Sequence, residues 1–379
     1  MSRQRLNMAS IRGIDLFCGC GGVTHGFLRA GIDMRLGVDF EGVYRETFEK
    51  NNKVPFIERD VRRLEIGEII GRLGGDKKAH LVVSSCAPCQ PFSLKNGKRS
   101  RDASVDPRID LGFELTRIVR ELLDQDVNCT GIFMENVPEF SKSPVWIGVR
   151  EELLKMGFSV AYNVVNCADY GTPQSRRRFI ALAVRGGGFL TMPRPTHGDG
   201  LLPTLTVRDA FKGLPKIQAG AECDVTPNHR SRALSELNFQ RINSVPLNGG
   251  SRSAFPEELV LECHKKFDGH KDVYGRMNFD TPSPTITTRC ISITNGRYGH
   301  PEEHRGISVR EAARLQTFPD DFVFHGTSIE TDARMIGNAV PVAVAELFGN
   351  YLASTIAKRF GLESCCNNNE QGERNNIAA

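Results

Sequence analysis

The sequence lacks features that would place it in several large classes of protein. No apolar run approaches the roughly 18 residues needed to cross a bilayer. The opening "MSRQRLNMAS" is polar and basic, and no secretory apolar region follows it. The eleven cysteines are an odd number scattered among strand-like segments, which argues against a disulfide framework and for reduced thiols. These absences predict a soluble cytoplasmic protein with no membrane partner.

The chain also has little net charge. Lys and Arg number 49 against 45 Asp and Glu, a formal net charge of +4, which permits a polyanionic partner without requiring one. With 379 residues, 40% of them hydrophobic, the chain can build one large domain or two ordinary ones.

The first part of the chain, residues 1–185, is predicted to form one α/β domain. From Ile11 onward, short β-rich runs alternate with helical patterns, which indicates a doubly wound, mostly parallel sheet with helices on both faces. The expected strands are 11–17, 33–40, 80–85, 131–137 and 179–184. The clearest helix is 111–125, because Leu115, Ile118, Val119 and Leu122 form one apolar face.

The rest of the chain divides into three predicted parts. Residues 186–282 are rich in Pro, Gly, His and Arg with weak periodicity, which indicates a smaller, loop-rich second domain. Residues 283–362 include a strongly periodic helix at 340–360, which needs an apolar partner and is expected to return to the first domain. Residues 363–379 are polar and low in complexity, as in a disordered tail.

The stretch "DLFCGCGG" predicts a strand, a glycine turn and a helix. This arrangement lets a ligand approach the backbone in doubly wound folds, although a plain tight turn explains the stretch equally well. The spacing is not the GxGxxG of dinucleotide folds, and no GK[ST] follows for a nucleoside triphosphate.

Two carboxylates follow predicted strands in this domain. Asp39 ends the second strand, where it can accept hydrogen bonds from a ribose, with Phe40 beside it as a stacking face. Asp60 follows a third strand and could read an adenine amino group. Either carboxylate could instead cap a helix or lie on the surface.

"SSCAPCQPFS" holds Cys86 and Cys89 at a spacing that suits a redox couple, half a zinc site or a single nucleophile. A thioredoxin-like couple needs its first Cys at a helix start, yet no helical pattern begins between Cys89 and Leu111. A zinc site would need a second CxxC or a His pair at suitable spacing. Pro88 and Pro91 clamp Cys89 in a loop just beyond a strand, where ligands bind in open α/β sheets.

Five blocks in this order carry a family resemblance: "DLFCGCGG", "APCQPFS", "MENV", "QSRRRF" and "GNAVPVAV". Together they resemble the DNA cytosine-5 methyltransferases, from Ile11 to Phe360. The resemblance implies an S-adenosylmethionine-dependent methyltransferase fold and a target-recognition domain at 186–282. It also implies methylation of one cytosine in a short site of double-stranded DNA. The absence of a long regulatory extension suggests an enzyme of the bacterial or phage restriction–modification type. We expect such an enzyme to act as a monomer and to be accompanied by a restriction endonuclease.

The resemblance also implies catalytic roles. Cys89 would add to carbon 6 of cytosine, because carbon 5 is too poor a nucleophile to attack a sulfonium methyl unaided. Glu135, as a buried acid, would donate a hydrogen bond or proton to ring nitrogen 3. Arg178 would contact the base and Arg176 would support it, since alternate residues along a strand point the same way.

The remaining implied contacts concern the cofactor and the DNA. Around S-adenosylmethionine we expect Phe17, Gly19, Gly21, Gly22, Asp39, Phe40, Asp60, Val61, Pro88, Leu111, Asn338 and Val340. Around the DNA we expect Gln90, Ser93, Lys95, Lys98, Arg99 and Arg101, from a basic loop that would close on phosphates. No metal is expected.

Three alternatives remain open at this point. A transfer-RNA cytosine methyltransferase shares these blocks, although the long variable region favours DNA. A catalytically silent DNA-binding relative is opposed by the joint presence of Cys89, Glu135 and Arg178. A redox protein would use Cys86 and Cys89 as equivalent thiols.

Overall fold

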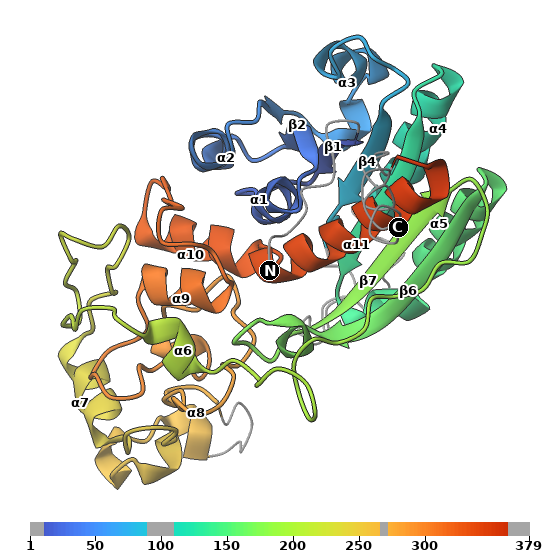
Figure 1. Cartoon of the computed structure of the whole chain (residues 1–379). Helices are drawn as coiled ribbons and strands as arrows, with labels where there is room; N and C mark the ends of the chain where they lie inside the picture. The colour runs from blue at the N-terminus through green and yellow to red at the C-terminus, as the bar shows by residue number, and fades with distance from the viewer. Residues whose placement is uncertain (1–10, 89–109, 266–271, 363–379) are drawn as a thin grey trace, which may run out of the picture.

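One seven-stranded sheet forms the centre of the protein (Figure 1). The computed structural model describes residues 11–88, 110–265 and 272–362. The strand order is β3-β2-β1-β4-β5-β7-β6, and β7 alone runs antiparallel to its neighbours. The strands are β1 (Ile11–Leu16), β2 (Asp33–Asp39), β3 (Phe56–Glu58), β4 (His80–Ser85), β5 (Cys129–Asn136), β6 (Phe158–Asn166) and β7 (Arg177–Arg185).

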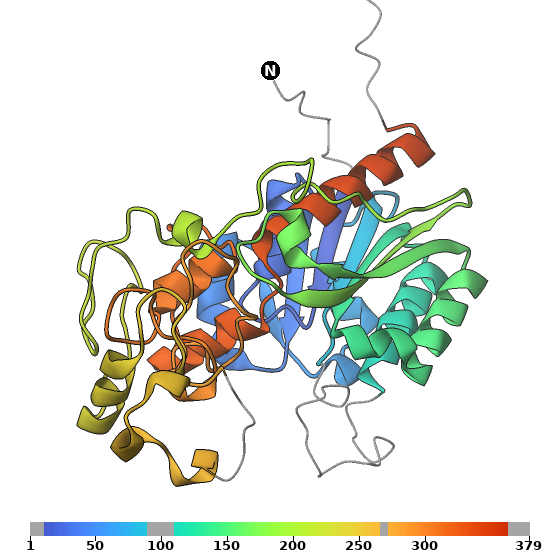
Figure 2. The same cartoon turned by 90° about the horizontal axis from the view of Figure 1, so that it is seen from below.

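Helices cover both faces of this sheet, as Figure 2 shows. One face packs against α1 (Gly22–Arg29), α2 (Arg45–Asn52) and α11 (Val342–Phe360), and the other against α3 (Ile66–Arg72), α4 (Leu111–Asp124) and α5 (Pro144–Lys155). The remaining helices are α6 (Val207–Phe211), α7 (Glu236–Ser244), α8 (Glu262–Lys265), α9 (Val309–Leu315) and α10 (Ile329–Asn338).

The central strands are buried along their whole length, which explains their nearly continuous apolar sequences. In β4, Val82 packs with the α1 and α11 side, whereas Leu81 and Val83 pack with the α4 side. Phe133 and Met134 of β5 alternate in the same way. A parallel strand covered on both faces needs apolar side chains on both. The predicted doubly wound sheet and each of its expected strands are therefore confirmed, to within a residue or two at their ends.

Helix α11 returns the end of the described chain to the first domain. It packs along α1, and small residues set the close approach: a Cβ added at Gly26 would lie 2.5 Å from Cβ of Ala345. Phe348 and Leu352 of α11 are fully buried. The apolar partner expected for this helix is therefore α1 together with the sheet.

Helices α10 and α11 together form the stretch 329–360. Among the described residues it is the one stretch long and apolar enough to cross a membrane by length and composition, and 56% of its apolar window is buried. Burial of this kind is typical of a helix in a protein core.

Residues 186–282 contain α6, α7 and α8, joined by long irregular segments that Figure 1 shows beside α9 and α10. Within their described part, pairing of the β type is limited to isolated bridges. The loop-rich character predicted for this region is therefore confirmed. The domain boundaries at 186, 283 and 363 stay predictions, and the tail 363–379 lies outside the described residues.

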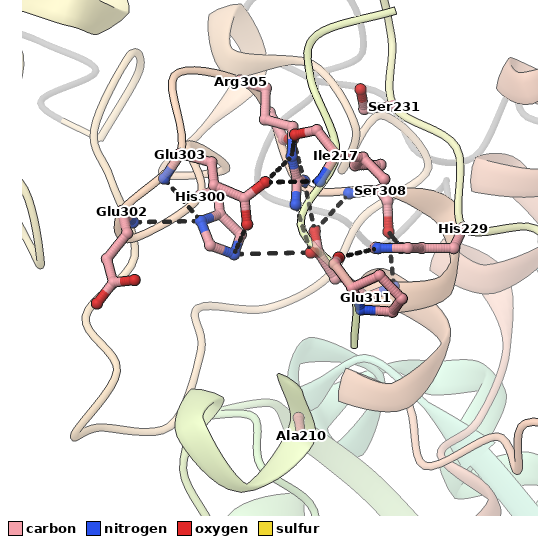
Figure 3. A network of polar contacts seen from close by, with 12 residues as sticks. Ala210, Ile217, His229, Ser231, His300, Glu302, Glu303, Arg305, Ser308 and Glu311 are labelled. Carbon is pink, nitrogen blue, oxygen red and sulfur yellow. Dashed lines mark hydrogen bonds and ion pairs between the residues drawn. The ribbon is translucent and has the colours of Figure 1, made fainter. Parts of the chain in front are cut away.

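A buried polar network ties this loop-rich region to the segment before α9 (Figure 3). The guanidinium of Arg305 donates to both carboxylate oxygens of Glu311 at 2.7 and 2.8 Å, and its Nε donates to the carbonyl of Ile217. His229 contacts Oγ of Ser308 at 2.9 Å. Burial by itself would raise the pKa of Glu311, but the hydrogen bonds and charge of Arg305 lower it to about 2.

We expect Glu311→Gln to destabilise the protein by about 3–5 kcal/mol at pH 7, because it leaves the buried Arg305 charge without its partner. The folded pKa of Glu311 lies below its ordinary value of 4.5, so its stabilisation is present above pH 4.5 and is lost as pH falls toward 2. The difference in the free energy of unfolding between wild type and variant, measured by urea unfolding, should therefore become smaller as pH falls below 4.5.

Asp280→Asn provides the matched control. Asp280 pairs with Arg208, but both side chains are more than half exposed, so its loss should change stability by less than about 1 kcal/mol. Equal penalties for the two variants would show that the buried network contributes no more than a surface pair.

Candidate active site

Glu135 and Arg178 meet at one end of the sheet. Glu135 lies near the end of β5 and Arg178 near the start of β7, two antiparallel neighbours. Nε of Arg178 lies 2.8 Å from Oε1 of Glu135 in an ion pair whose side chains are only 15% and 10% exposed. Nη1 of Arg178 also donates to the carbonyl of Arg177 at 2.7 Å. The carboxylate is thus held in place by a cation in a largely desolvated position.

The segment leading to Cys89 is anchored beside this pair. The amide of Cys86 donates to the carbonyl of Leu16 just after β4. The carbonyl of Ala87 accepts a hydrogen bond from Nδ2 of Asn136, the residue after Glu135. Pro88 is the last described residue of this segment. Cys89 lies outside the described residues, as do the expected DNA contacts Gln90, Ser93, Lys95, Lys98, Arg99 and Arg101.

Cys86 is a poor candidate for redox chemistry. Burial, together with the charges of Glu135 and Asp15, raises the pKa of Cys86 well above its ordinary value of 9.0. A redox-active thiol needs a lowered pKa, because the thiolate is the reactive form. Among the described residues, which do not include Cys89, no group of three or more His, Cys, Asp or Glu is suited to a metal ion.

Asp15 is a buried acid next to this end of the sheet that the sequence did not single out. Its carboxylate accepts hydrogen bonds from Oγ of Ser84 at 2.6 Å and from Oγ1 of Thr24 at 2.7 Å, so it joins β1, β4 and α1. Burial raises the pKa of Asp15 to about 6, although both hydroxyl donors act in the opposite direction.

Arg176 and Gln174 tie three distant segments together. The buried guanidinium of Arg176 donates to the carbonyls of Ile286, Gly337 and Ala339. The amide of Gln174 donates to the carbonyl of Leu315, and its carbonyl oxygen accepts from the amide of Ile286. Arg176 directly precedes the first residue of β7. The common direction expected for Arg176 and Arg178, and the supporting role expected for Arg176, stay predictions.

The glycine turn after β1 is closed by residues from the end of the chain. Phe17, Gly19 and Gly21 have positive φ angles of 59°, 53° and 95°. A Cβ at Gly22 would lie 2.7 Å from the carbonyl oxygen of Val340, so only glycine allows this approach. The structure thus brings Val340 to the turn, whereas Asn338 lies exposed at the end of α10.

Asp39 lies against the same turn. Its carboxylate accepts hydrogen bonds from the amide of Gly19 at 2.9 Å and from the amide of Glu41 at 3.0 Å. Burial raises the pKa of Asp39, while these amides oppose the rise. The neighbouring ring of Phe40 is 60% exposed, which is unusual for a side chain of this size.

The other expected cofactor residues are less informative. Asp60 caps a short 3₁₀ turn, Val61–Arg63, and pairs with Arg62, which is the alternative that its position left open. The hydrogen bond from Arg62 lowers the pKa of Asp60. Val61 and Leu111 are both buried. Contact of these residues with a cofactor stays a prediction.

Comparisons with known proteins identify the family. The sequence matches the C-5 cytosine-specific DNA methylases over residues 11–354, and the chain belongs to this family. It is 39% identical over 356 residues to the Type II methylase M.HgiDII of Herpetosiphon aurantiacus, covering 92% of this chain and 95% of the relative. It is 33% identical over 350 residues to the Type II methyltransferase M1.HphI of Haemophilus parahaemolyticus, covering 91% and 87%.

Solved structures agree on the fold. The methyltransferase EhMeth of Entamoeba histolytica has a TM-score of 0.62 at 17% identity and covers 91% of this chain and 98% of its own. The Dnmt2 methyltransferase of S. pombe has a TM-score of 0.60 at 17% identity and covers 92% and 99%. The resemblance drawn from the five sequence blocks is therefore confirmed, as are the methyltransferase fold and the assignment as a DNA cytosine-5 methylating enzyme.

We expect Asp15 to make the stability of the protein depend on pH between 4 and 6. Its folded pKa of about 6 exceeds the ordinary 3.8, so the folded state retains a proton that the unfolded state loses, and this contribution to stability falls as pH rises from 4 to 6. The loss is about 3 kcal/mol, from roughly two pKa units at 1.36 kcal/mol each. Asp15→Asn should abolish it, as urea unfolding of both proteins across this range would test.

Ser84→Ala provides an internal check on this assignment. It removes the donor 2.6 Å from the Asp15 carboxylate, so the upper end of the pH window should move to higher pH. A wild-type stability that changes with pH in parallel with that of Asp15→Asn would contradict the raised pKa.

Proposed function

We propose that this chain converts one cytosine within a short, specific sequence of double-stranded DNA to 5-methylcytosine, with S-adenosylmethionine as the methyl donor. The observation that carries the proposal is the desolvated Glu135–Arg178 pair beside the anchored segment that leads into Cys89. Addition to a cytosine ring requires an acid and a nucleophilic thiol. The pair supplies a carboxyl group with a guanidinium to orient it, and we infer that Cys89 supplies the thiol.

The residues around the glycine turn fit S-adenosylmethionine. A Cβ added at Gly19 would meet no atom of the described residues within 4 Å, so the backbone there faces open space among them. The exposed ring of Phe40 can stack on an adenine, and the Asp39 carboxylate retains lone pairs for ribose hydroxyls beyond the two amides it already binds. We infer that Gly19, Asp39 and Phe40 hold the nucleoside, and that Val340 closes the turn behind it.

We infer the following catalytic roles. S-adenosylmethionine, when bound, supplies an electrophilic methyl group. The thiolate of Cys89 forms a bond to carbon 6 of cytosine, and the displaced electron pair makes carbon 5 nucleophilic. Glu135 donates a hydrogen bond or proton to ring nitrogen 3 as negative charge develops there, and Arg178 orients Glu135. After methylation, carbon 5 loses its proton to a base, the carbon–sulfur bond breaks, and the thiolate is restored.

A cytosine stacked in a duplex cannot present carbon 6 to an attacking thiol, so the base must leave the duplex, at a cost of a few kcal/mol. We infer that contacts from Lys95, Lys98, Arg99 and Arg101 and from region 186–282 offset that cost. Transfer RNA is the rival substrate, and parallel methylation assays on duplex DNA and transfer RNA distinguish the two.

The named relatives suggest the enzyme's context. Both are Type II enzymes, which supports a role beside a restriction endonuclease. We infer action as a monomer in the cytoplasm. Bisulfite sequencing of DNA from a host that expresses the chain would identify the methylated site.

Replacing Cys89 by Ser should reduce methyl transfer by several powers of ten, because a hydroxyl has a far higher pKa than a thiol and is a poorer nucleophile. Cys86→Ser is the matched control and should keep substantial activity, with a stability loss of about 1–3 kcal/mol if its hydroxyl lacks a partner. Trapping on 5-fluorocytosine DNA should give a covalent complex with Cys86→Ser and none with Cys89→Ser. Equal loss of trapping in the two variants would refute the unequal roles.

Exchanging region 186–282 for that of a relative should change which sequence is methylated, because side chains of this region would contact the base edges. Affinity for S-adenosylmethionine should stay within a few fold, since the glycine turn, Asp39 and Phe40 lie outside the exchanged region. Bisulfite sequencing and calorimetric titration of the cofactor measure the two effects. Loss of cofactor binding with an unaltered site would mean that the region is wrongly bounded.

A further inference from the structure

A hollow of about 620 Å³ lies between α10 and the segment 288–295. Its lining includes Thr288, Arg289, Ser292 and Asn295 of this segment, together with Arg334 of α10 and Arg232 from the loop-rich region. Glu330 is the one carboxylate in the lining, against three arginines. The hollow is therefore rich in hydrogen-bond donors and carries excess positive charge.

The three arginines of the hollow make few or long hydrogen bonds and ion pairs within the described part of the protein. Within the described part of the chain, the exposed guanidinium of Arg289 makes no hydrogen bond or ion pair. Arg232 lies 3.7 Å from Glu330, and both side chains are about half exposed. Arg334 lies 3.5 Å from Glu41, and its Nε is buried without a hydrogen-bond partner among the described residues. Such contacts leave most of the donor capacity of the three side chains available to a ligand.

The hollow adjoins the active site on one side. A Cβ at Gly337 of α10 would lie 2.2 Å from the carbonyl carbon of Thr287, so the helix and the segment touch directly. Arg176 holds the carbonyls of Ile286 and Gly337 at this junction, two residues before Arg178. On its other side, Arg334 reaches toward Glu41, whose amide binds the Asp39 carboxylate.

The shape of the hollow and its hydrogen-bond donors favour a phosphate over a base edge as its ligand. A hollow in the protein can accept a part of the DNA that protrudes, such as its backbone. Contact with base edges requires instead a protein element that protrudes into the major groove. Arginine and hydroxyl side chains match acceptor-only oxygens, and phosphate oxygens are the commonest partners of such donors on DNA.

We propose that this hollow seats a backbone phosphate of the DNA substrate, with Arg289 as its principal partner and Arg232 and Arg334 beside it. The inference rests on the proposed function, since it takes duplex DNA as the substrate. It assigns Arg289 to affinity and to placement of the duplex, and not to the choice of sequence.

The test measures binding of the full-length protein to a cognate and a non-cognate duplex over a range of salt concentrations. Arg289→Ala should weaken binding to both by a similar factor. It should also reduce the slope of log K against log salt by about 0.9, the value for one lost phosphate contact. The methylated sequence, read by bisulfite sequencing, should not change.

Two further variants distinguish a phosphate from a base. Arg289→Lys keeps the positive charge, so it should retain most of the salt slope if Arg289 contacts a phosphate. If Arg289 instead makes a bidentate contact to a base, Lys cannot replace it and that contact would be lost. Arg120→Ala removes another exposed arginine, from α4, which packs on the other face of the sheet, and should leave the slope unchanged. A changed methylation site in Arg289→Ala, or an unchanged salt slope, would overturn the proposal.

The wild-type protein separates this inference from the proposed function. If wild type binds and methylates duplex DNA while Arg289→Ala keeps its full slope, only the phosphate subsite is wrong. If wild type neither binds nor methylates duplex DNA, the proposed function itself fails.

Discussion

The hydrogen bonds of Gln174 and Arg176 are the constraint on which the rest of the site depends. These two side chains bind the backbone at Ile286, Leu315, Gly337 and Ala339, four points that are remote from them in the sequence. They lie immediately before β7, the strand that carries Arg178. The position of Arg178 against Glu135 and the position of Val340 against the glycine turn are therefore fixed by one buried cluster.

The same device recurs in the loop-rich part of the protein. Loops have no ladder partners for their carbonyl groups, and a buried carbonyl without a donor is costly. Arg276 donates to the carbonyls of Ile242, Val245 and His300, and Arg310 to those of Pro227, Pro319 and Phe322. Burial lowers the pKa of Arg276 to about 10, still a cation at neutral pH. Each of these arginines thus supplies hydrogen-bond donors to the buried carbonyl groups of several loops, as neighbouring strands do for one another in the sheet.

What the sequence could and could not predict follows from the range of the interactions. The apolar run of β4 and the periodic face of α4 are local signals, and both elements were predicted nearly to the residue. Glu135 and Arg178 were found because they lie in short, specific blocks. Asp15 was missed because its donor Ser84 is 69 residues away, and no local pattern encodes that pairing. The carbonyl groups that Arg176 binds could not be predicted either, because they lie more than 100 residues away from it in the sequence. The hollow around Arg289 could not be foreseen, since its walls come from segments that only tertiary packing brings together.

The contact between Gly22 and Val340 also has a consequence for how the protein is made. A ribosome synthesises the chain from its N-terminus, so the turn at Gly19–Gly22 emerges more than 300 residues before the segment that closes it. Throughout that interval α1 lacks the face of α11 against which it packs. The side of α1 that packs on α11 therefore gains its partner only when residues 342–360 have been synthesised.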